Sequence, residues 1–230
     1  MMWSMRLQRK WGLLPHAILV AVIALSCASA LARSRNHKGK GKPGVFDYYV
    51  LSLSWSPEYC AEPAGKNDNV QCGQGRRYGF VVHGLWPQYE KGFPESCAPH
   101  STVSSAIVDR TLPLMPSSKL IQHEWDKHGT CSGLDTAAYF DLIRSVREGV
   151  KIPDDYTAPI KQVTARRTDI KEKFVAANAG YALDSLHLLC SGRFLSEVRV
   201  CFSKDMKPRA CSADVRDACS TDPVILRPLR

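Results

Sequence analysis

Residues 123–131 read His-Glu-Trp-Asp-Lys-His-Gly-Thr-Cys, which places two histidines, a glutamate and a lysine within six consecutive positions. On an α-helix, His123 and Lys127 are neighbours, and so are Glu124 and His128, because residues four apart share a face. Gly129 is a natural place for such a helix to end. The stretch is therefore predicted to present cationic donors, one acceptor and titratable imidazoles to a single phosphate-sized ligand.

A zinc site is the first alternative for this stretch. The zinc-protease signature HExxH needs its two histidines at i and i+4 on one helix face. Here Lys127 occupies the i+4 position, and the second histidine follows at i+5. A cation at the position of a metal ligand argues against a metal site, and we expect neither a metal nor another cofactor.

A second stretch, residues 80–88, reads Phe-Val-Val-His-Gly-Leu-Trp-Pro-Gln and overlaps a strand predicted over 77–85, which carries His83. A lone histidine near a strand end is most often structural. In this case Gly84 permits close backbone approach beside His83, and Trp86 offers a surface on which a nucleobase can stack. We expect the two stretches to face each other across one active site.

The charge and these side chains together favour RNA cleavage. The formal net charge of the 230-residue chain is +9, which favours anionic partners such as nucleic acid or a membrane surface. Several histidines without a metal suit cleavage of a phosphodiester by a general acid and a general base. Ribose supplies its own nucleophile, the 2′-hydroxyl, so such an enzyme would cut RNA and spare DNA.

The two stretches resemble the two active-site segments of the ribonuclease T2 family. The resemblance extends to residues 46–57, Phe-Asp-Tyr-Tyr-Val-Leu-Ser-Leu-Ser-Trp-Ser-Pro, and to residues 196–202, Ser-Glu-Val-Arg-Val-Cys-Phe. It covers most of residues 45–212, and the first of these segments resembles the bacterial, periplasmic ribonuclease I-like branch. The resemblance implies a metal-independent endoribonuclease acting on single-stranded RNA, both a lyase and a hydrolase.

The resemblance also implies a role for each site residue. His128 would take the proton from the 2′-hydroxyl and His83 would protonate the leaving 5′-oxygen, although the reverse assignment stays open. His123 would hold the phosphate, while Glu124 and Lys127 would stabilise the pentacoordinate phosphorane. The first product would be a 2′,3′-cyclic phosphate, which the same pair hydrolyses to a 3′-phosphate.

One position departs from the family pattern. Some members place a base-reading aspartate after the Trp-Pro pair, whereas this chain has Gln88 there. We therefore expect Trp86 and Gln88 to contact the base, and cleavage to show a broad base preference.

Cysteine usage and the N-terminus both indicate export. Arg6, Arg9 and Lys10 precede an apolar run over 12–30, and small residues allow cleavage after Ala30 or Ala32. Residues 1–32 are thus predicted to be a signal peptide. A lipid-modified Cys27 is the less well-matched alternative. Cleavage removes three positive charges and no negative one, which leaves +6. A basic, Gly-rich tail follows over 33–44 and is most simply solvated.

Eight cysteines remain after the predicted cleavage, and no two have the CxxC spacing of a zinc site. An even number in an exported chain predicts four disulfides. Sequence alone leaves 105 pairings open. The family resemblance implies Cys60–Cys72, Cys97–Cys131, Cys190–Cys219 and Cys201–Cys211.

The remaining pattern predicts one α+β domain over 45–230, with a central antiparallel sheet packed against several helices. We expect strands at 45–55, 77–85, 185–190, 197–203 and 223–226, and helices at 101–114, 117–129, 136–150 and 164–178. The mature protein is expected to be an exported, periplasmic or secreted, monomer with RNA as its substrate and no stable membrane partner. An exported RNA-binding protein without activity and a metallohydrolase are the competing hypotheses.

Overall fold

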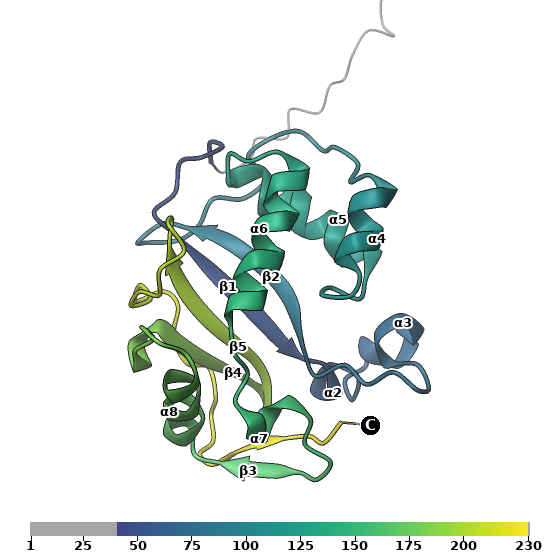
Figure 1. Ribbon diagram of the computed structural model, residues 1–230, viewed down its shortest axis with the longest axis vertical. Coiled ribbons are helices and arrows are strands. Elements are labelled where there is room, and N and C mark those ends of the chain that lie inside the picture. The colour runs from purple at the N-terminus through teal and green to yellow at the C-terminus, as the bar shows by residue number, and fades with distance from the viewer. Residues whose placement is uncertain (1–40, 230) are drawn as a thin grey trace, which may run out of the picture. The chain divides into compact units, whose positions relative to one another are not determined.

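The computed structural model describes residues 41–229, so the predicted signal peptide and residues 33–40 of the tail lie outside the described residues. Strands and helices alternate irregularly along the chain (Figure 1). The strands are β1 (Tyr48–Trp55), β2 (Phe80–Gln88), β3 (Val163–Ala165), β4 (Leu186–Ser191), β5 (Phe194–Ser203) and β6 (Val224–Leu226). The α-helices are α2 (Ser56–Tyr59), α3 (Asn69–Cys72), α4 (Ser105–Thr111), α5 (Ser118–Lys127), α6 (Thr136–Gly149), α7 (Asp154–Thr157) and α8 (Arg167–Ala177). Short 3₁₀ turns are η1 (Gly65–Asn67), η2 (Gly129–Cys131) and η3 (Leu183–Ser185).

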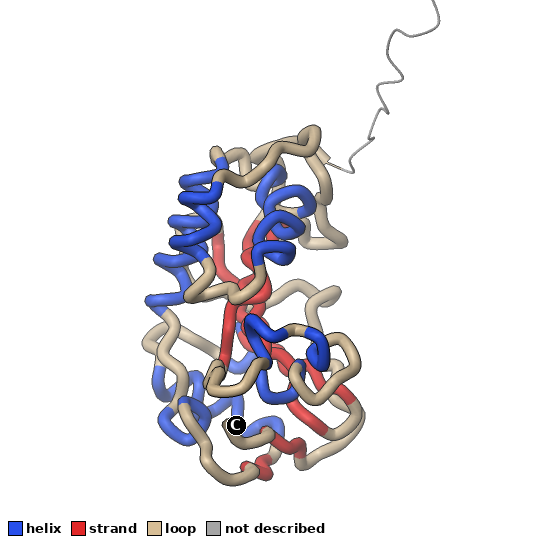
Figure 2. The backbone as a smooth tube through the Cα atoms, turned by 90° about the vertical axis from the view of Figure 1, so that its right-hand side faces the viewer, coloured by secondary structure: helices blue, strands red, loops and turns tan. Residues whose placement is uncertain are grey.

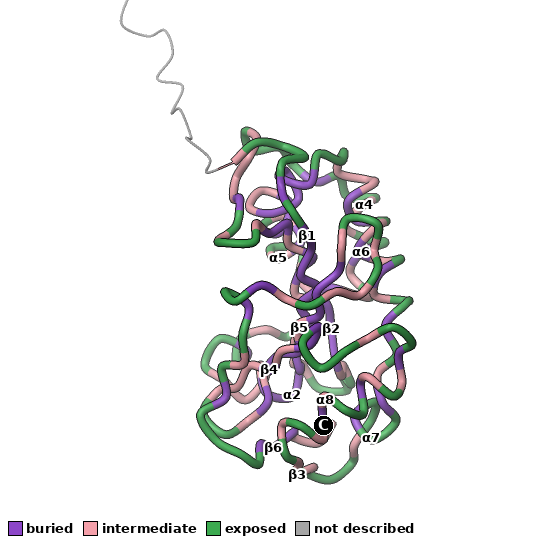
Figure 3. The backbone as a smooth tube through the Cα atoms, turned by 90° about the vertical axis from the view of Figure 1, so that its left-hand side faces the viewer, coloured by how far each residue is buried: buried purple, intermediate pink, exposed green. Residues whose placement is uncertain are grey.

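The six strands form one sheet with the order β2-β1-β5-β6-β3, and β4 pairs with β5 beside this path. All neighbours are antiparallel except β5 and β6, which run parallel where Phe194 meets Ile225. Strand β1 is central and almost entirely buried (Figure 3). The α+β class and the central antiparallel sheet are confirmed.

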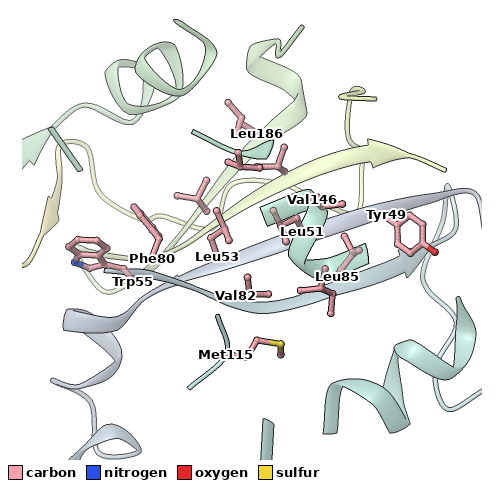
Figure 4. Close-up of a cluster of buried hydrophobic side chains, with 14 of the residues drawn as sticks. Tyr49, Leu51, Leu53, Trp55, Phe80, Val82, Leu85, Met115, Val146 and Leu186 are labelled. Atoms are coloured by element: carbon pink, nitrogen blue, oxygen red, sulfur yellow. The ribbon is translucent and has the colours of Figure 1, made fainter. Parts of the chain in front are cut away.

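The two faces of β1 have different partners. Leu51, Leu53 and Trp55 enter the main hydrophobic core, which is drawn in Figure 4. Alternate residues point to opposite faces of a strand, so Tyr48 and Val50 lie on the other face. There they form a small separate cluster with residues of β5 and the C-terminal loop.

Helices flank the strands (Figure 2) and bury apolar residues in the main core. Helix α6 contributes Phe140 and Ile143, and α8 contributes Ile170 and Phe174. Helix α5 lies beyond the edge strand β2 and contributes Trp125 to the same core. Its His123, Glu124 and Lys127 side chains line a cavity together with His83 and Trp86 of β2.

The chain between 163 and 178 differs from its prediction. We expected a helix over 164–178, but Val163–Ala165 is a strand that pairs with β6, and the helix begins at Arg167. The pairing joins segments about sixty residues apart, so local helical spacing could not reveal it. The short helices α2, α3 and α7 were also not predicted.

Four disulfides join the eight cysteines of the described chain: Cys60–Cys72, Cys97–Cys131, Cys190–Cys219 and Cys201–Cys211. These are the pairs that the family resemblance implies. Cys97–Cys131 ties the loop after β2 to the turn that follows α5. Among residues 41–229, no helix combines the length and apolarity needed to cross a membrane.

Candidate active site

A β-bulge in β2 aims His83 at the site. Ser52 of β1 pairs with Gly84, and Leu53 pairs with Val82, so His83 has no partner in the ladder. In a regular strand, His83 and a residue three positions later would point to opposite faces. The extra residue in the bulge shifts the alternation of side chains between the two faces of the strand. His83 and Trp86 therefore both line the same cavity of about 400 Å³.

Gly84 allows β2 and α5 to come close together. A Cβ atom at this position would lie 2.1 Å from Glu124 Oε2 and 2.2 Å from Trp86 Nε1. Those two atoms form a hydrogen bond, in which Trp86 Nε1 donates to Glu124 Oε2 at 2.7 Å. Only glycine leaves space for this bond, which fixes the indole and the carboxylate against each other.

Helix α5 positions the second wall of the cavity. The Ser117 hydroxyl caps the helix by accepting from Leu120 N at 3.2 Å. Glu124 and Trp125 are buried, whereas His123 is exposed, and His128 forms the C-cap. His123, Glu124, Lys127 and His128 all line the cavity with His83. The structure therefore brings together every ionisable residue that the sequence singled out.

His128 lies in an apolar environment at the end of α5. It is 6% exposed, and its ring centroid lies 5.4 Å from that of Trp86 and 6.3 Å from that of Phe93. Burial, with the nearby charges of Lys127, His123 and His83, lowers the pKa of His128 to about 3. Its Nδ1 atom has no hydrogen-bond partner in the described chain, so no hydrogen bond at this nitrogen stabilises an imidazolium.

His83 lies between two carboxylates. Its Nε2 is 3.9 Å from Glu124 Oε1, and its Nδ1 is 3.7 Å from Glu197 Oε1. Burial opposes protonation, but the interactions with Glu197 and then Glu124 outweigh burial and the charge of Arg199, so the pKa of His83 is raised. The two histidines thus have opposite preferences: His83 favours the charged form and His128 the neutral form.

Glu124 and His123 are shifted as well. Burial raises the pKa of Glu124 to about 7, against the opposing effects of His83, Trp86 and Lys127. Desolvation and the charge of Lys127 lower the pKa of His123. Near neutral pH the Glu124 carboxyl group is therefore present in both its protonated and its ionised form, next to Lys127 and a neutral His123.

Comparisons with known proteins identify the family of this chain. The model of the ribonuclease T2 family matches residues 46–211, which include both walls of the cavity. The chain belongs to the ribonuclease T2 family. Membership in this family makes it an endoribonuclease.

Individual relatives are similar over most of their length. A ribonuclease of Aeromonas hydrophila is 37% identical over 171 residues, which span 73% of this chain and 77% of that protein. Ribonuclease I of Escherichia coli is 26% identical over 234 residues, which span 83% of this chain and 86% of that protein. Ribonuclease MC1 from bitter gourd seeds superposes with a TM-score of 0.61 at 27% identity, covering 78% of this chain and all of the other. RNase NT in complex with 5′-AMP superposes with a TM-score of 0.66 at 22% identity, covering 80% of this chain and 99% of the other. This similarity shows the fold.

Trp86 and Gln88, the expected base contacts of this T2-family chain, have intramolecular partners. The guanidinium carbon of Arg199 lies 5.0 Å from the Trp86 ring centroid, and His128 packs against the same indole. Gln88 is 8% exposed, and its Nε2 donates to Pro87 O at 3.0 Å. Both residues line the cavity, so they remain candidates for base contacts, with the indole also supporting His128.

Sequence reasoning did not identify several residues of this T2-family site. Phe93, Glu197, Arg199, Asp214 and Val215 all lie at the cavity or at His83. One signal was present, because Glu197 and Arg199 are charged residues that alternate with valines in a predicted strand. Phe93, Asp214 and Val215 carried no such signal in the sequence, because only the tertiary structure brings them to the cavity.

Proposed function

We propose that the protein cleaves single-stranded RNA by metal-independent transesterification. His128, neutral over the working pH range, accepts the proton of the 2′-hydroxyl, and the 2′-oxygen attacks the adjacent phosphorus. His83, protonated, donates its proton to the departing 5′-oxygen. The supporting observation is that these two histidines face one cavity in environments that shift their pKa values in opposite directions.

The other site residues act on the phosphate. His123 and Lys127 line the cavity and supply hydrogen bonds and positive charge to the non-bridging oxygens. Glu124, with a pKa near 7, is largely protonated at mildly acidic pH and can then donate a hydrogen bond to the phosphorane rather than repel it. The products are a 2′,3′-cyclic phosphate and a free 5′-hydroxyl. In a second step, water attacks the cyclic phosphate while the two histidines exchange their acid and base roles. The ring opens and yields a 3′-phosphate.

The base is proposed to lie against Trp86, Gln88 and Phe93. Phe93 is 47% exposed at the cavity and offers an apolar stacking surface. The Gln88 amide carries both a donor and an acceptor, so it can adapt to different base edges. This supports the expected broad base preference.

Cleavage of matched oligonucleotides tests the reaction. RNA, DNA of the same sequence, and RNA with a single 2′-deoxy nucleotide are incubated with the protein with and without EDTA, and products are identified by mass spectrometry. We expect cyclic phosphates from RNA, no cut at the deoxy position or in DNA, and no effect of EDTA. Activity lost with EDTA would support a metallohydrolase, and binding without any cleavage would support an inactive RNA-binding protein.

Three histidine variants complete this test. His83→Ala and His128→Ala should each reduce kcat by about 10²- to 10⁴-fold while the protein still folds. His100→Ala is the matched control, because His100 is exposed and paired with Asp126 rather than lining the cavity. Near-normal activity in either of the first two variants would contradict the assigned pair.

We also propose that the protein is exported and works as a monomer, with its signal peptide cleaved after Ala30 or after Ala32. Four disulfides support this compartment, because such bonds persist in oxidising environments. N-terminal sequencing of the protein recovered from periplasm and medium, with light scattering of the purified protein, tests both statements. An intact leader or a dimer would contradict them.

A further inference from the structure

Glu197 is a buried carboxylate in the middle of β5. It is 9% exposed and stands next to Val198, a core residue with no exposed surface. Its pairing partners are Ser54 on β1 and Leu189 on β4. A carboxylate in such a position is costly to bury unless cationic groups pair with it, so its partners indicate why it is there.

Two small residues of β1 allow Glu197 to reach the site. Strand β1 lies between β5 and β2, and strands two apart are separated by roughly 9–10 Å. Ser54 pairs with Glu197 on one side, and Ser52 pairs with Gly84 on the other. Above these short side chains, Glu197 Oε1 comes within 3.7 Å of Nδ1 of the bulged His83.

Glu197 has two cationic partners at ion-pair distance in the described chain, His83 and Arg199. Arg199 Nε lies 3.4 Å from Glu197 Oε1, and the guanidinium also lies over the Trp86 ring. Burial acts to raise the pKa of Glu197, but these two cations outweigh it and lower the pKa. The carboxylate therefore stays ionised while His83 is charged.

Glu124, on the other side of the imidazole, cannot replace Glu197. It is shared with Trp86 through the indole hydrogen bond, and its pKa near 7 means that it loses its negative charge in mildly acidic solution. It also lies near Nε2, the nitrogen that has to face the leaving group. Glu197 lies near Nδ1 and leaves Nε2 free.

We propose that Glu197 is the positioning residue of His83: it holds the Nδ1 side of the ring, keeps the imidazole protonated, and so directs Nε2 at the leaving 5′-oxygen. This rests on the proposed function of His83 as the acid. Arg199 limits the effect by competing for the same carboxylate and by repelling the imidazolium.

Other titratable groups also face His83, and Glu197→Gln leaves all of them in place. Glu124, His123 and His128 face it from α5, and Arg199 faces it from β5. On its remaining side, His83 borders a second cavity shared with Tyr59 and Asp68. A change in titration after the substitution is therefore attributable to the lost carboxylate.

The pH dependence of cleavage of a dinucleoside monophosphate tests the proposal. In Glu197→Gln we expect the alkaline limb of kcat to move about one pH unit lower, since an adjacent opposite charge shifts a pKa by about 1–3 units. Activity should fall about tenfold at pH 7.5 and recover near pH 5, with little change in KM. Arg199→Gln should move the same limb to higher pH, and Glu197→Asp should restore part of the wild-type profile.

A second measurement does not depend on activity. Titration of the His83 ring protons by NMR in wild type, Glu197→Gln and Glu197→Asp should show the pKa of His83 falling in the first variant and partly restored in the second. An equal loss of activity at all pH values, or an unchanged His83 titration, would overturn the positioning role. If Glu197→Gln behaves as wild type while His83→Ala is inactive, the positioning role fails and the proposed reaction stands. An active His83→Ala would refute the proposed reaction itself.

Discussion

Trp86 Nε1 donates a 2.7 Å hydrogen bond to Glu124 Oε2, which joins β2 to α5 within the site. The bond passes over Gly84, where any side chain would collide with both of its atoms. The alignment of the two cavity walls therefore depends on one missing Cβ atom.

Gly84→Ala tests this alignment. The added methyl group has to push Glu124 and Trp86 apart, so we expect a loss in kcat of about 10²-fold, the usual result of a displacement near 1 Å. Stability should fall by about 1–3 kcal/mol, the usual cost of overpacking. Kinetics and thermal unfolding measure the two effects. Gly149→Ala is the matched control, because a Cβ atom there meets nothing within 4 Å. Wild-type activity in Gly84→Ala would contradict the alignment argument.

The opposite shifts of the histidines predict a bell-shaped pH dependence of kcat/KM. His128 must be neutral, so activity falls as pH drops through its pKa of about 3. His83 must be protonated, so activity falls as pH rises through its pKa, which lies above the usual 6.5. The optimum is expected in mildly acidic solution. A pH series measured at constant ionic strength checks this, and a flat profile from pH 4 to pH 9 would be incompatible with the assigned pair.

Asp214 is expected to hold the loop that carries Phe93. Its Oδ2 accepts a 2.6 Å hydrogen bond from Gly92 N, and Val215 beside it also lines the cavity. Removing a charged hydrogen-bond partner costs about 1.5–3 kcal/mol. Because the loop is exposed, we expect Asp214→Ala to raise KM about three- to tenfold with kcat nearly unchanged. Steady-state kinetics measure this, with Asp109→Ala, an exposed aspartate on α4, as control. An unchanged KM would mean that the loop is held by other contacts.

Asp217 is expected to contribute stability that depends on pH. It accepts from Leu188 N at 2.8 Å and pairs with Lys171 at 3.0 Å and His187 at 3.3 Å. Burial acts to raise its pKa, but these partners outweigh burial and place the pKa well below the ordinary value. A lowered carboxyl pKa stabilises the fold above the unfolded-state value, near 3.9, and the contribution disappears as pH falls below it.

The substitution Asp217→Asn should therefore cost about 2 kcal/mol at pH 7. For a domain of this size this lowers Tm by about 4–8 °C. The difference from wild type should shrink below pH 4, because Asp217 takes up a proton there in the unfolded chain while the folded protein still holds it ionised. Thermal unfolding at pH 7, 5 and 3 measures it. A difference that does not depend on pH would show that the charge of Asp217 is not the cause.

Local patterns in the sequence predicted much of the fold. The strand predicted over 45–55 is β1 of the structure, and the helix predicted over 117–129 is α5, for which Ser117 is the N-cap. The prediction was wrong at Val163–Ala165, because that strand exists only through its pairing with the distant β6. Local spacing reports the conformation that a segment favours, and a distant partner can override it.

The sequence by itself determined which chemical groups the site contains, since His83, His123, Glu124, Lys127 and His128 stand out by type and spacing. Only the tertiary structure decided how they differ. The bulge puts His83 and Trp86 on one face, the apolar surroundings keep His128 neutral, and Glu197 reaches His83 across β1. The physical reason is that a protonation state depends on burial and on nearby charges, and both are set by segments far apart in the chain.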